Sequence, residues 1–217
     1  MPSDARDFVL ANTVLAASPL VPEIKLHLAA EVTPLWQATE AALERHQLPP
    51  PYWAFAWAGG QALARHLLDH PELVAGRRVL DFGAGCGIVA IAAAKAGARV
   101  AAAEIDSFAV AALSLNAAAN GVDLAIETGD VLAQDGGGWD VILAGDMCYE
   151  RPLAERLLVW LEVRARGGAL VLLGDPGRAY LPKSGIAALA RYVVPTPLDL
   201  EDRVARETTV WRLTATR

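Results

Sequence analysis

Residues 79–87 read VLDFGAGCG, a short apolar run that leads directly into three closely spaced glycines. Glycine lets a chain turn tightly and lets a ligand approach the backbone, and the N-terminus of a following helix offers unpaired N–H groups. The pattern predicts a buried strand over Val79–Phe82 and a helix over Cys86–Ala96 that ends at Gly97. This arrangement of strand, glycine turn and helix is typical of α/β folds that bind nucleotide-like ligands.

Strands and helices continue to alternate after this turn. Apolar runs predict strands over Arg99–Ile105, Leu124–Thr128, Val141–Ala144 and Ala169–Leu173, and helices from an N-cap at Ser107 to Ala119 and from about Pro152 to Arg164. The tail is predicted to add a helix near Ile186–Tyr192 and two strands, around Val193–Leu198 and Thr208–Leu213. Such alternation gives right-handed crossovers. We therefore expect an α/β, Rossmann-like, doubly wound sheet of seven strands, five of them parallel and the last antiparallel.

The segment before the sheet differs in composition. One amphipathic helix is predicted over about 22–46, perturbed at Pro34 and stopped by three prolines at 49–51. The aromatic run YWAFAW at 52–57 and a short helix over Gln61–Leu68 follow. We expect one domain over 1–217, with a helical and aromatic extension at 1–70 and the Rossmann-like core at 78–217.

Composition and charge restrict the possible partners. The 217 residues are 54% hydrophobic and 20% charged, which predicts a compact fold, and the net charge of −6 disfavours nucleic acids and anionic membranes. The two cysteines and four histidines show no metal-ligand spacing, so no metal is expected. The N-terminal residues resemble neither a secretory signal nor a transit peptide, and no apolar run spans a membrane. We expect a cytoplasmic protein.

The spacing of the glycines indicates the ligand. The pattern is D-x-G-x-G-x-G, whereas dinucleotide-binding loops follow G-x-G-x-x-G. The acidic Asp81 comes directly before the loop, where it would repel the pyrophosphate of a dinucleotide and favour the ammonium of a methionine moiety. Glu104 follows Gly83 by 21 residues, the spacing expected of a carboxylate that binds ribose hydroxyls. These features favour S-adenosylmethionine, and a dinucleotide or a glycine turn without ligand are the alternatives. The predicted cofactor-binding residues are Trp57, Asp81, Gly83, Ala84, Gly85, Glu104, Asp130 and Ala144.

Asp130 follows the third predicted strand of the core. It is placed to contact the adenine amino group, and a simple loop-entry acid explains it equally well. Asp106 is a second acid near Glu104, but the strand's pleat turns the two side chains differently, so it is the weaker candidate.

Residues 145–149 read GDMCY and follow a predicted strand, so they fall at the edge where α/β sheets bind ligands. We predict that Asp146 orients an amine and assists its deprotonation. Tyr149 is predicted to line the channel through which the amine enters and to contact its charge by cation–π attraction. The alternative for Asp146 is a cap for the helix at Pro152. Cys148 is interpreted as a packing residue.

Two further segments are predicted to reach this edge. The aromatic run at 52–57 is either a lid over the cofactor or packing for the N-terminal helix. The turn GDPGR at 174–178 closes the next strand. Trp53, Asp175 and Arg178 are the predicted substrate-binding residues.

Taken together, the segments at 21–26, 51–63, 79–87, 145–149 and 174–178 resemble those of the lysine methyltransferases of the electron-transfer flavoprotein β-subunit. The resemblance extends over most of the chain. It implies a class I, seven-β-strand protein methyltransferase that uses S-adenosylmethionine to methylate lysines of that flavoprotein subunit. The missing transit peptide suggests a bacterial member of a family that is mitochondrial in animals. Alternatives are a methyltransferase acting on a ribosomal protein or a small amine, a nicotinamide-dependent oxidoreductase, and a non-catalytic binding domain.

Overall fold

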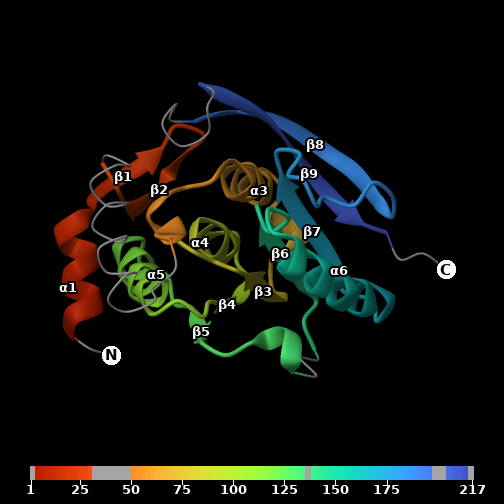
Figure 1. Ribbon diagram of the computed structural model, residues 1–217, viewed down its shortest axis with the longest axis horizontal. Coiled ribbons are helices and arrows are strands. Elements are labelled where there is room, and N and C mark those ends of the chain that lie inside the picture. Colours follow the sequence, from red (N-terminus) through yellow and green to blue (C-terminus); the bar gives the residue numbers. More distant parts are fainter. Residues whose placement is uncertain (1–2, 31–49, 135–137, 197–203, 215–217) are drawn as a thin grey trace.

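The computed structural model describes residues 3–30, 50–134, 138–196 and 204–214, and its centre is a seven-stranded sheet (Figure 1). The strand order is β5-β4-β3-β6-β7-β9-β8. The strands are β3 (Arg78–Phe82), β4 (Arg99–Ala103), β5 (Ala125–Glu127), β6 (Val141–Gly145), β7 (Leu170–Asp175), β8 (Ile186–Pro195) and β9 (Ala205–Leu213). The first five in this order are parallel, and β9 runs antiparallel to both of its neighbours. The predicted fold class is confirmed.

Helices cover both faces of the sheet. Three lie on one face, α3 (Ala58–Asp69), α4 (Ile88–Lys95) and α5 (Ser107–Ala119), and α6 (Arg151–Arg166) lies on the other (Figure 1). Because side chains alternate along a strand, Val79 faces the core under α4 and Leu80 faces the core under α6. Burial on both faces explains why the central strands β3, β4, β6 and β7 are largely apolar runs.

The start of α5 differs from the prediction. Asp106, and not Ser107, is the N-cap, and its Oδ1 accepts a hydrogen bond of 2.9 Å from the Phe108 N–H. Aspartate and serine are both good N-caps, so the sequence pattern placed the helix correctly but not its first residue.

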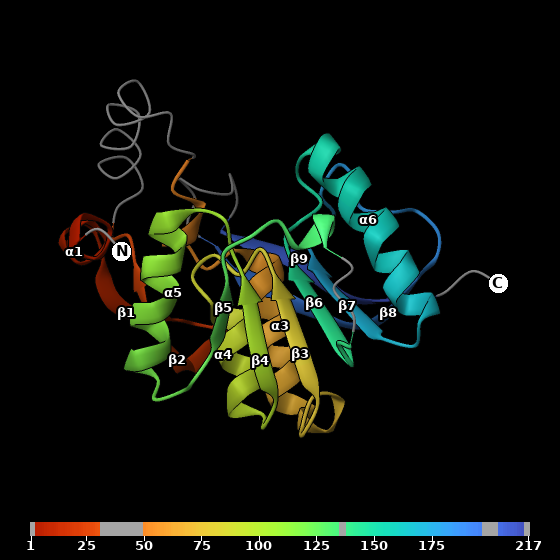
Figure 2. The same cartoon turned by 90° about the horizontal axis from the view of Figure 1, so that it is seen from below.

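The N-terminal extension is only partly helical, and the predicted long helix is wrong over Val21–Leu28. That segment is strand β2, which pairs antiparallel with β1 (Val14–Ser18). It buries Val21, Ile24 and Leu26, so the alternation of Ile24 and Leu26 was the informative pattern. Residues 31–46 of the predicted helix lie outside the described residues. An unpredicted helix, α1 (Ser3–Asn12), packs beside α5 (Figure 2).

The predicted helix at Ile186–Tyr192 is also wrong, because these residues belong to strand β8. Three alanines in the segment favour a helix locally, but pairing with β9 along the whole strand overrides that preference. Within the described ranges, no helix has the length and apolar character needed to cross a membrane.

Candidate active site

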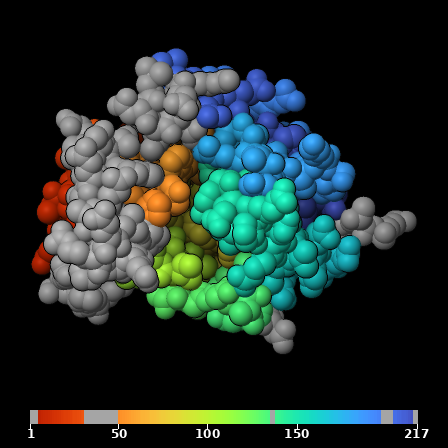
Figure 3. Space-filling view, viewed as in Figure 1, coloured from red at the N-terminus to blue at the C-terminus, as the bar shows by residue number. Residues whose placement is uncertain are grey.

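Most of the predicted site residues gather at the edge of the sheet where β3, β4, β6 and β7 end. Figure 3 shows this edge hollowed between the segment around 52–57 (orange), the residues after β6 (teal) and the yellow-green residues that follow β3 and β4. Ligands of open α/β sheets bind outside the carboxyl ends of strands, so this hollow is the candidate active site.

The glycine loop after β3 has a conformation that requires glycine. Gly83 and Gly85 have φ values of +64° and +52°, in the left-handed region. A Cβ on Gly83 would lie 2.5 Å from the Sδ of Met147. The Gly83 and Ala84 N–H groups both donate to the Ala103 carbonyl at 3.1 Å, which ties the loop to the end of β4.

Glu104 lies beside this loop. Its Oε2 accepts from the Gly85 N–H at 3.0 Å, and its Oε1 accepts from the Ile105 and Asp106 N–H groups at 2.8 and 3.2 Å. A carboxylate offers about four lone-pair positions, so three donors fix the orientation of Glu104 and leave capacity to accept from a hydroxyl.

Asp81 supports the loop from below. Its side chain is buried at the end of β3, and its Oδ2 accepts a hydrogen bond of 2.9 Å from the Ala90 N–H in the first turn of α4. Burial is the main cause that raises the pKa of Asp81 to about 8, and the nearby Glu104 raises it further. The carboxyl of Asp81 is therefore largely protonated at neutral pH.

Asp130 and Ala144, two further predicted cofactor-binding residues, differ in their surroundings. Asp130 caps η3 (Val131–Ala133) by accepting from the Leu132 N–H at 3.0 Å, and it pairs with Arg156 at 2.8 Å. The hydrogen bond from Arg156 is the main cause that lowers the pKa of Asp130. Ala144 is buried near the end of β6. The cofactor contacts of Asp130 and Ala144 stay predictions.

Asp146 is the most constrained residue of the site. It has a φ of +58°, unusual for a residue with a side chain, and its N–H donates to the Gly174 carbonyl at 2.9 Å. Oδ1 accepts from both Nε and Nη2 of Arg178 at 2.7 Å, and Oδ2 accepts from the Gly59 N–H at the start of α3. Asp146 therefore caps α3, not the helix at Pro152 that the alternative interpretation named.

Burial dominates the electrostatics of Asp146. It raises the pKa of the carboxyl to about 6, and Asp175 adds to the increase while Arg178 and the Gly59 N–H oppose it. A carboxyl with this pKa is mostly ionised at neutral pH and protonates in mild acid.

The turn after β7 carries the arginine. Oδ1 of Asp175 accepts from the Gly177 and Arg178 N–H groups, both at 2.6 Å, and this carboxyl is buried. The guanidinium of Arg178 lies 5.7 Å from the ring centroid of Trp57. Three segments that are distant in the chain therefore meet here: the start of α3, the residues after β6 and the turn after β7.

Aromatic rings form one side of the hollow. Tyr52 packs edge-on against Trp57 at 5.8 Å and against Tyr149 at 5.6 Å between ring centroids, and the Trp57 indole N–H donates to the Tyr52 carbonyl at 2.8 Å. Trp53 instead is buried and stacks on Phe108 at 6.5 Å. The aromatic run was predicted to be either a lid over the cofactor or packing for the N-terminal helix. Some of its rings face the site, whereas Trp53 belongs to the core, so each interpretation holds for part of the run.

Sequence reasoning missed Tyr52 and Gly59. Tyr52 belongs to the aromatic segment from which only Trp53 and Trp57 are predicted as site residues. Gly59 carried a visible signal, the Gly59-Gly60 pair. A Cβ on Gly59 would lie 2.1 Å from the Gly174 carbonyl oxygen, so glycine is needed for this close approach.

Both cysteines are buried near the site. Cys86 lies inside the glycine loop, and burial raises the pKa of its thiol to about 12; the pKa of the Cys148 thiol is raised to about 12 for the same reason. Neither has the low pKa of a nucleophilic cysteine, which supports the packing interpretation.

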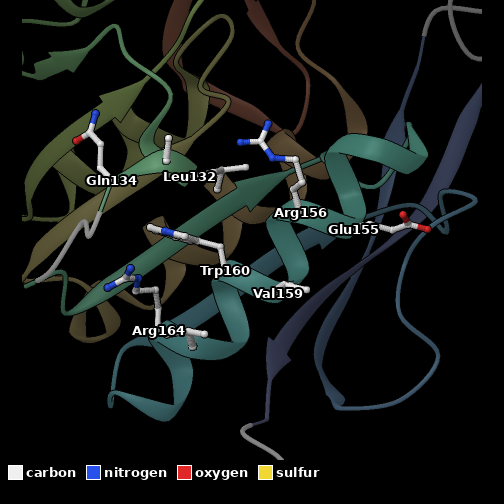
Figure 4. A pocket seen from close by; sticks show the side chains of 9 residues that line it. Leu132, Gln134, Glu155, Arg156, Val159, Trp160 and Arg164 are labelled. Atoms are coloured by element: carbon white, nitrogen blue, oxygen red, sulfur yellow. The ribbon is translucent and has the colours of Figure 1, made fainter.

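A second concave region lies away from this edge. A groove of about 610 Å³ runs between η3 and α6, and Trp160 forms its floor (Figure 4). Its lining residues include none of the predicted site residues. Among the described residues, no group of three or more histidine, cysteine or acidic side chains is arranged to hold a metal ion.

The sheet order, the glycine loop and the carboxylate at the end of β4 define a class I methyltransferase, and the pattern of the methyltransferase small domain family matches residues 55–145. The chain is 40% identical to the electron transfer flavoprotein beta subunit lysine methyltransferase of Danio rerio, in an alignment covering 96% of this chain and 83% of that protein. The chain belongs to this family of lysine methyltransferases.

More distant similarities agree with the class. A ribosomal protein L11 methyltransferase of an Exiguobacterium species is 28% identical over 84% of this chain and 59% of that protein. The crystal structure of magnesium protoporphyrin IX methyltransferase from Synechocystis, with bound S-adenosylhomocysteine, has a TM-score of 0.51 and 22% identity over 71% of this chain and 81% of that chain. This structural likeness shows the fold.

Proposed function

We propose that the chain transfers the methyl group of S-adenosylmethionine to lysine side chains of the β-subunit of the electron-transfer flavoprotein. The observation that carries this proposal is the 40% identity to the Danio rerio enzyme, named for that substrate, over nearly the whole chain. The net charge of −6 favours a protein over a nucleic acid as the substrate.

The residues at the hollow edge fit the cofactor. Gly83 and Gly85 leave the loop backbone bare, and Glu104 presents a fixed carboxylate beside it for ribose hydroxyls. Asp81, Ala84, Asp130, Ala144 and Trp57 complete the proposed cofactor-binding set. When bound, S-adenosylmethionine supplies an electrophilic methyl group on a sulfonium.

The lysine is proposed to enter beside Asp146. A lysine ammonium has an ordinary pKa of about 10.4, so the enzyme must bind the charged amine and assist the loss of its proton. Asp146, ionised at neutral pH and held at a fixed orientation, is suited to accept a hydrogen bond from the incoming amine. It orients the nitrogen, and alignment of the reacting atoms lowers the entropic cost of the reaction.

Tyr149 and Trp57 are proposed to exclude water from the amine. Tyr149 is 40% exposed at the rim, so its ring is accessible to an entering side chain. Burial, and after it the neighbouring Tyr52, Glu150 and Glu104, raise the pKa of Tyr149 to about 12, so its hydroxyl stays neutral and does not serve as a base at neutral pH. The proposed direct substrate contacts of Trp53, Asp175 and Arg178 are less favoured by the geometry, because Trp53 stacks on Phe108 in the core, Asp175 holds its own turn and Arg178 is engaged by Asp146.

The test is a methylation assay with defined substrates. The purified chain is incubated with isotope-labelled S-adenosylmethionine and, separately, with the electron-transfer flavoprotein and the ribosomal protein L11 of the same organism. We expect labelled lysine in the flavoprotein β-subunit, located by mass spectrometry of its peptides. Label in L11 alone would reject the proposed substrate and keep the reaction class. Label on nucleic acid in an RNA-containing extract would reject protein methylation.

A further inference from the structure

The ion pair between Arg178 and Asp146 is enclosed at the edge of the active site. Nε and Nη2 of Arg178 both lie 2.7 Å from Oδ1 of Asp146. The Arg178 and Asp146 side chains are 20% and 8% exposed, so solvent screens their attraction less than it screens surface ion pairs. An incoming amine would meet this carboxylate with the arginine already beside it.

Arg178 is itself held in place by two further contacts. Its N–H donates to Oδ1 of Asp175 at 2.6 Å, which fixes the turn that carries it. Its guanidinium lies over the ring of Trp57 at 5.7 Å, a distance at which cation–π attraction contributes. The guanidinium is therefore held between Asp146 and the Trp57 ring.

Asp146 requires such a cation because other features of its surroundings favour the protonated form. It is buried, and the described titratable groups that face it besides Arg178 are Asp175, from the turn after β7, and the Cys148 thiol. From α3 it receives the Gly59 N–H. Burial beside a second carboxyl raises a carboxyl pKa, whereas an adjacent guanidinium lowers it.

We propose that Arg178 is a positioning residue, which holds the Asp146 carboxylate ionised and oriented for the lysine amine and does not bind the substrate itself. This inference deepens the proposed function, since it rests on Asp146 as the group that receives the amine. In this proposal, the G-D-P-G-R turn after β7 keeps the carboxylate of Asp146, which follows the neighbouring strand β6, in its charged form.

The first test follows the Asp146 carboxyl directly, without substrate or cofactor. Its titration is measured by ¹³C NMR of protein labelled at the aspartate carboxyl carbon, and Asp146→Asn identifies the signal. In Arg178→Gln we expect the pKa of Asp146 to rise by about 1–3 units, the usual effect of losing an adjacent opposite charge. Arg178→Lys, which keeps the charge, should stay near wild type. An unchanged titration in Arg178→Gln would overturn the proposal.

Arg65 provides a matched control. It pairs with Glu23 at 2.6 Å and Asp69 at 2.8 Å, and its side chain is 18% exposed, close to the value for Arg178. Arg65→Gln removes an arginine of similar exposure from α3 together with ion pairs to Glu23 and Asp69, which are 48% and 46% exposed, so it should leave the Asp146 titration unchanged. If the pKa of Asp146 rose by the same amount in Arg65→Gln, the rise in Arg178→Gln would reflect general destabilisation of the fold and not the loss of the adjacent charge.

A second measurement needs no substitution and covers the case in which Arg178→Gln does not fold. In the wild-type protein, the ¹⁵N and ¹H shifts of the Arg178 Nε–H should titrate with the same midpoint as the Asp146 carboxyl. Nε–H shifts that do not change through this midpoint would contradict the proposal.

Activity then separates positioning from substrate contact. With the pKa of Asp146 raised to about 7–9, its ionised fraction at pH 7 falls roughly 2- to 90-fold, and kcat should fall with it and recover towards pH 9. A raised KM for the protein substrate at every pH, with an unshifted kcat profile, would make Arg178 a substrate contact. Faster turnover in Arg178→Gln would make it an obstruction. Because the NMR titrations need no substrate, they distinguish failure of this inference from failure of the proposed function.

Discussion

The two sides of the hollow hold their carboxylates in different ways. On the glycine-loop side, formed by Asp81, Gly83, Gly85 and Glu104, the acids accept hydrogen bonds from main-chain N–H groups. On the Asp146 side, formed by Asp146, Tyr149, Arg178 and Trp57, the acid is held by an arginine side chain as well as by one N–H group. The acids of the first side are oriented by backbone conformation, whereas the orientation of Asp146 also depends on the side chain of a second residue, Arg178.

Asp146→Asn should give the largest effect. It removes the charge at nearly constant volume, so lysine methylation should fall about 10²- to 10⁴-fold, the usual contribution of a positioned acid–base group. Affinity for S-adenosylhomocysteine should change by a factor of a few at most. Initial rates and calorimetry measure the two quantities. Methylation close to wild type would leave Asp146 only its role as the cap of α3, and parallel loss of cofactor affinity would place it in the cofactor site.

Glu104→Ala should affect the opposite side. Losing charge-assisted hydrogen bonds should weaken S-adenosylhomocysteine binding by about 1.5–3 kcal/mol, or roughly 10- to 150-fold. At a saturating concentration of the methyl donor, turnover should recover, because Asp146 is unaltered. Calorimetry checks the affinity, with Glu104→Gln as a control that keeps the volume. An unchanged affinity would mean that Glu104 serves only to order the loop.

Gly59→Ala should disturb the contact of α3 with strand β7 and with Asp146, which follows β6. The added Cβ would lie 2.1 Å from the Gly174 carbonyl oxygen and 2.5 Å from Oδ2 of Asp146, so backbone must move. We expect a loss of about 1–3 kcal/mol in the free energy of unfolding, as for other overpacked sites, measured in urea. Gly60→Ala is the control, since its nearest neighbour is the Ile88 side chain at 3.2 Å. Equal stabilities of the two variants would contradict the close approach.

The smallest effect concerns Asp81. Its folded pKa, about 8, is raised above the ordinary value, so protonation stabilises the fold and this contribution is lost as pH rises through 8. Between pH 7 and 9, wild type should lose about 1 kcal/mol of unfolding free energy relative to Asp81→Asn, which does not titrate. Urea unfolding of both proteins at the two pH values tests this. A constant difference would show that Asp81 does not change protonation there.

The parts of the fold that the sequence predicted are local. The run before Gly83 is buried on both faces, and Glu104 ends the neighbouring parallel strand, so their meeting follows from the order of elements alone. The failures lie where a partner decides the structure. The alanines of β8 favour a helix until β9 pairs with them. The apolar residues of β2 also fit the helical spacing predicted over about 22–46, and only their pairing with β1 makes them a strand.

The site divides in the same way. The positions of Asp146 and Arg178 after two adjacent strands were predictable, but the contact between them joins residues 32 apart in the chain. It depends on rotamers and on the left-handed backbone of Asp146, neither of which a sequence pattern specifies. The same holds for Gly59, which is 87 residues from the carboxylate that it binds.

The buried thiol of Cys86 can report chemically on whether the glycine loop is open or closed. With a pKa of about 12, the closed loop presents about one thiolate per 10⁵ thiols at neutral pH, so alkylating reagents react only after the loop opens. The rate of modification under pulse labelling therefore measures the opening equilibrium of this one segment. A ligand that closes the loop would slow the reaction in proportion to its occupancy, so binding could be followed by the mass of the peptide that carries Cys86, separately from the peptide with Cys148, without a dye, a radiolabel or turnover.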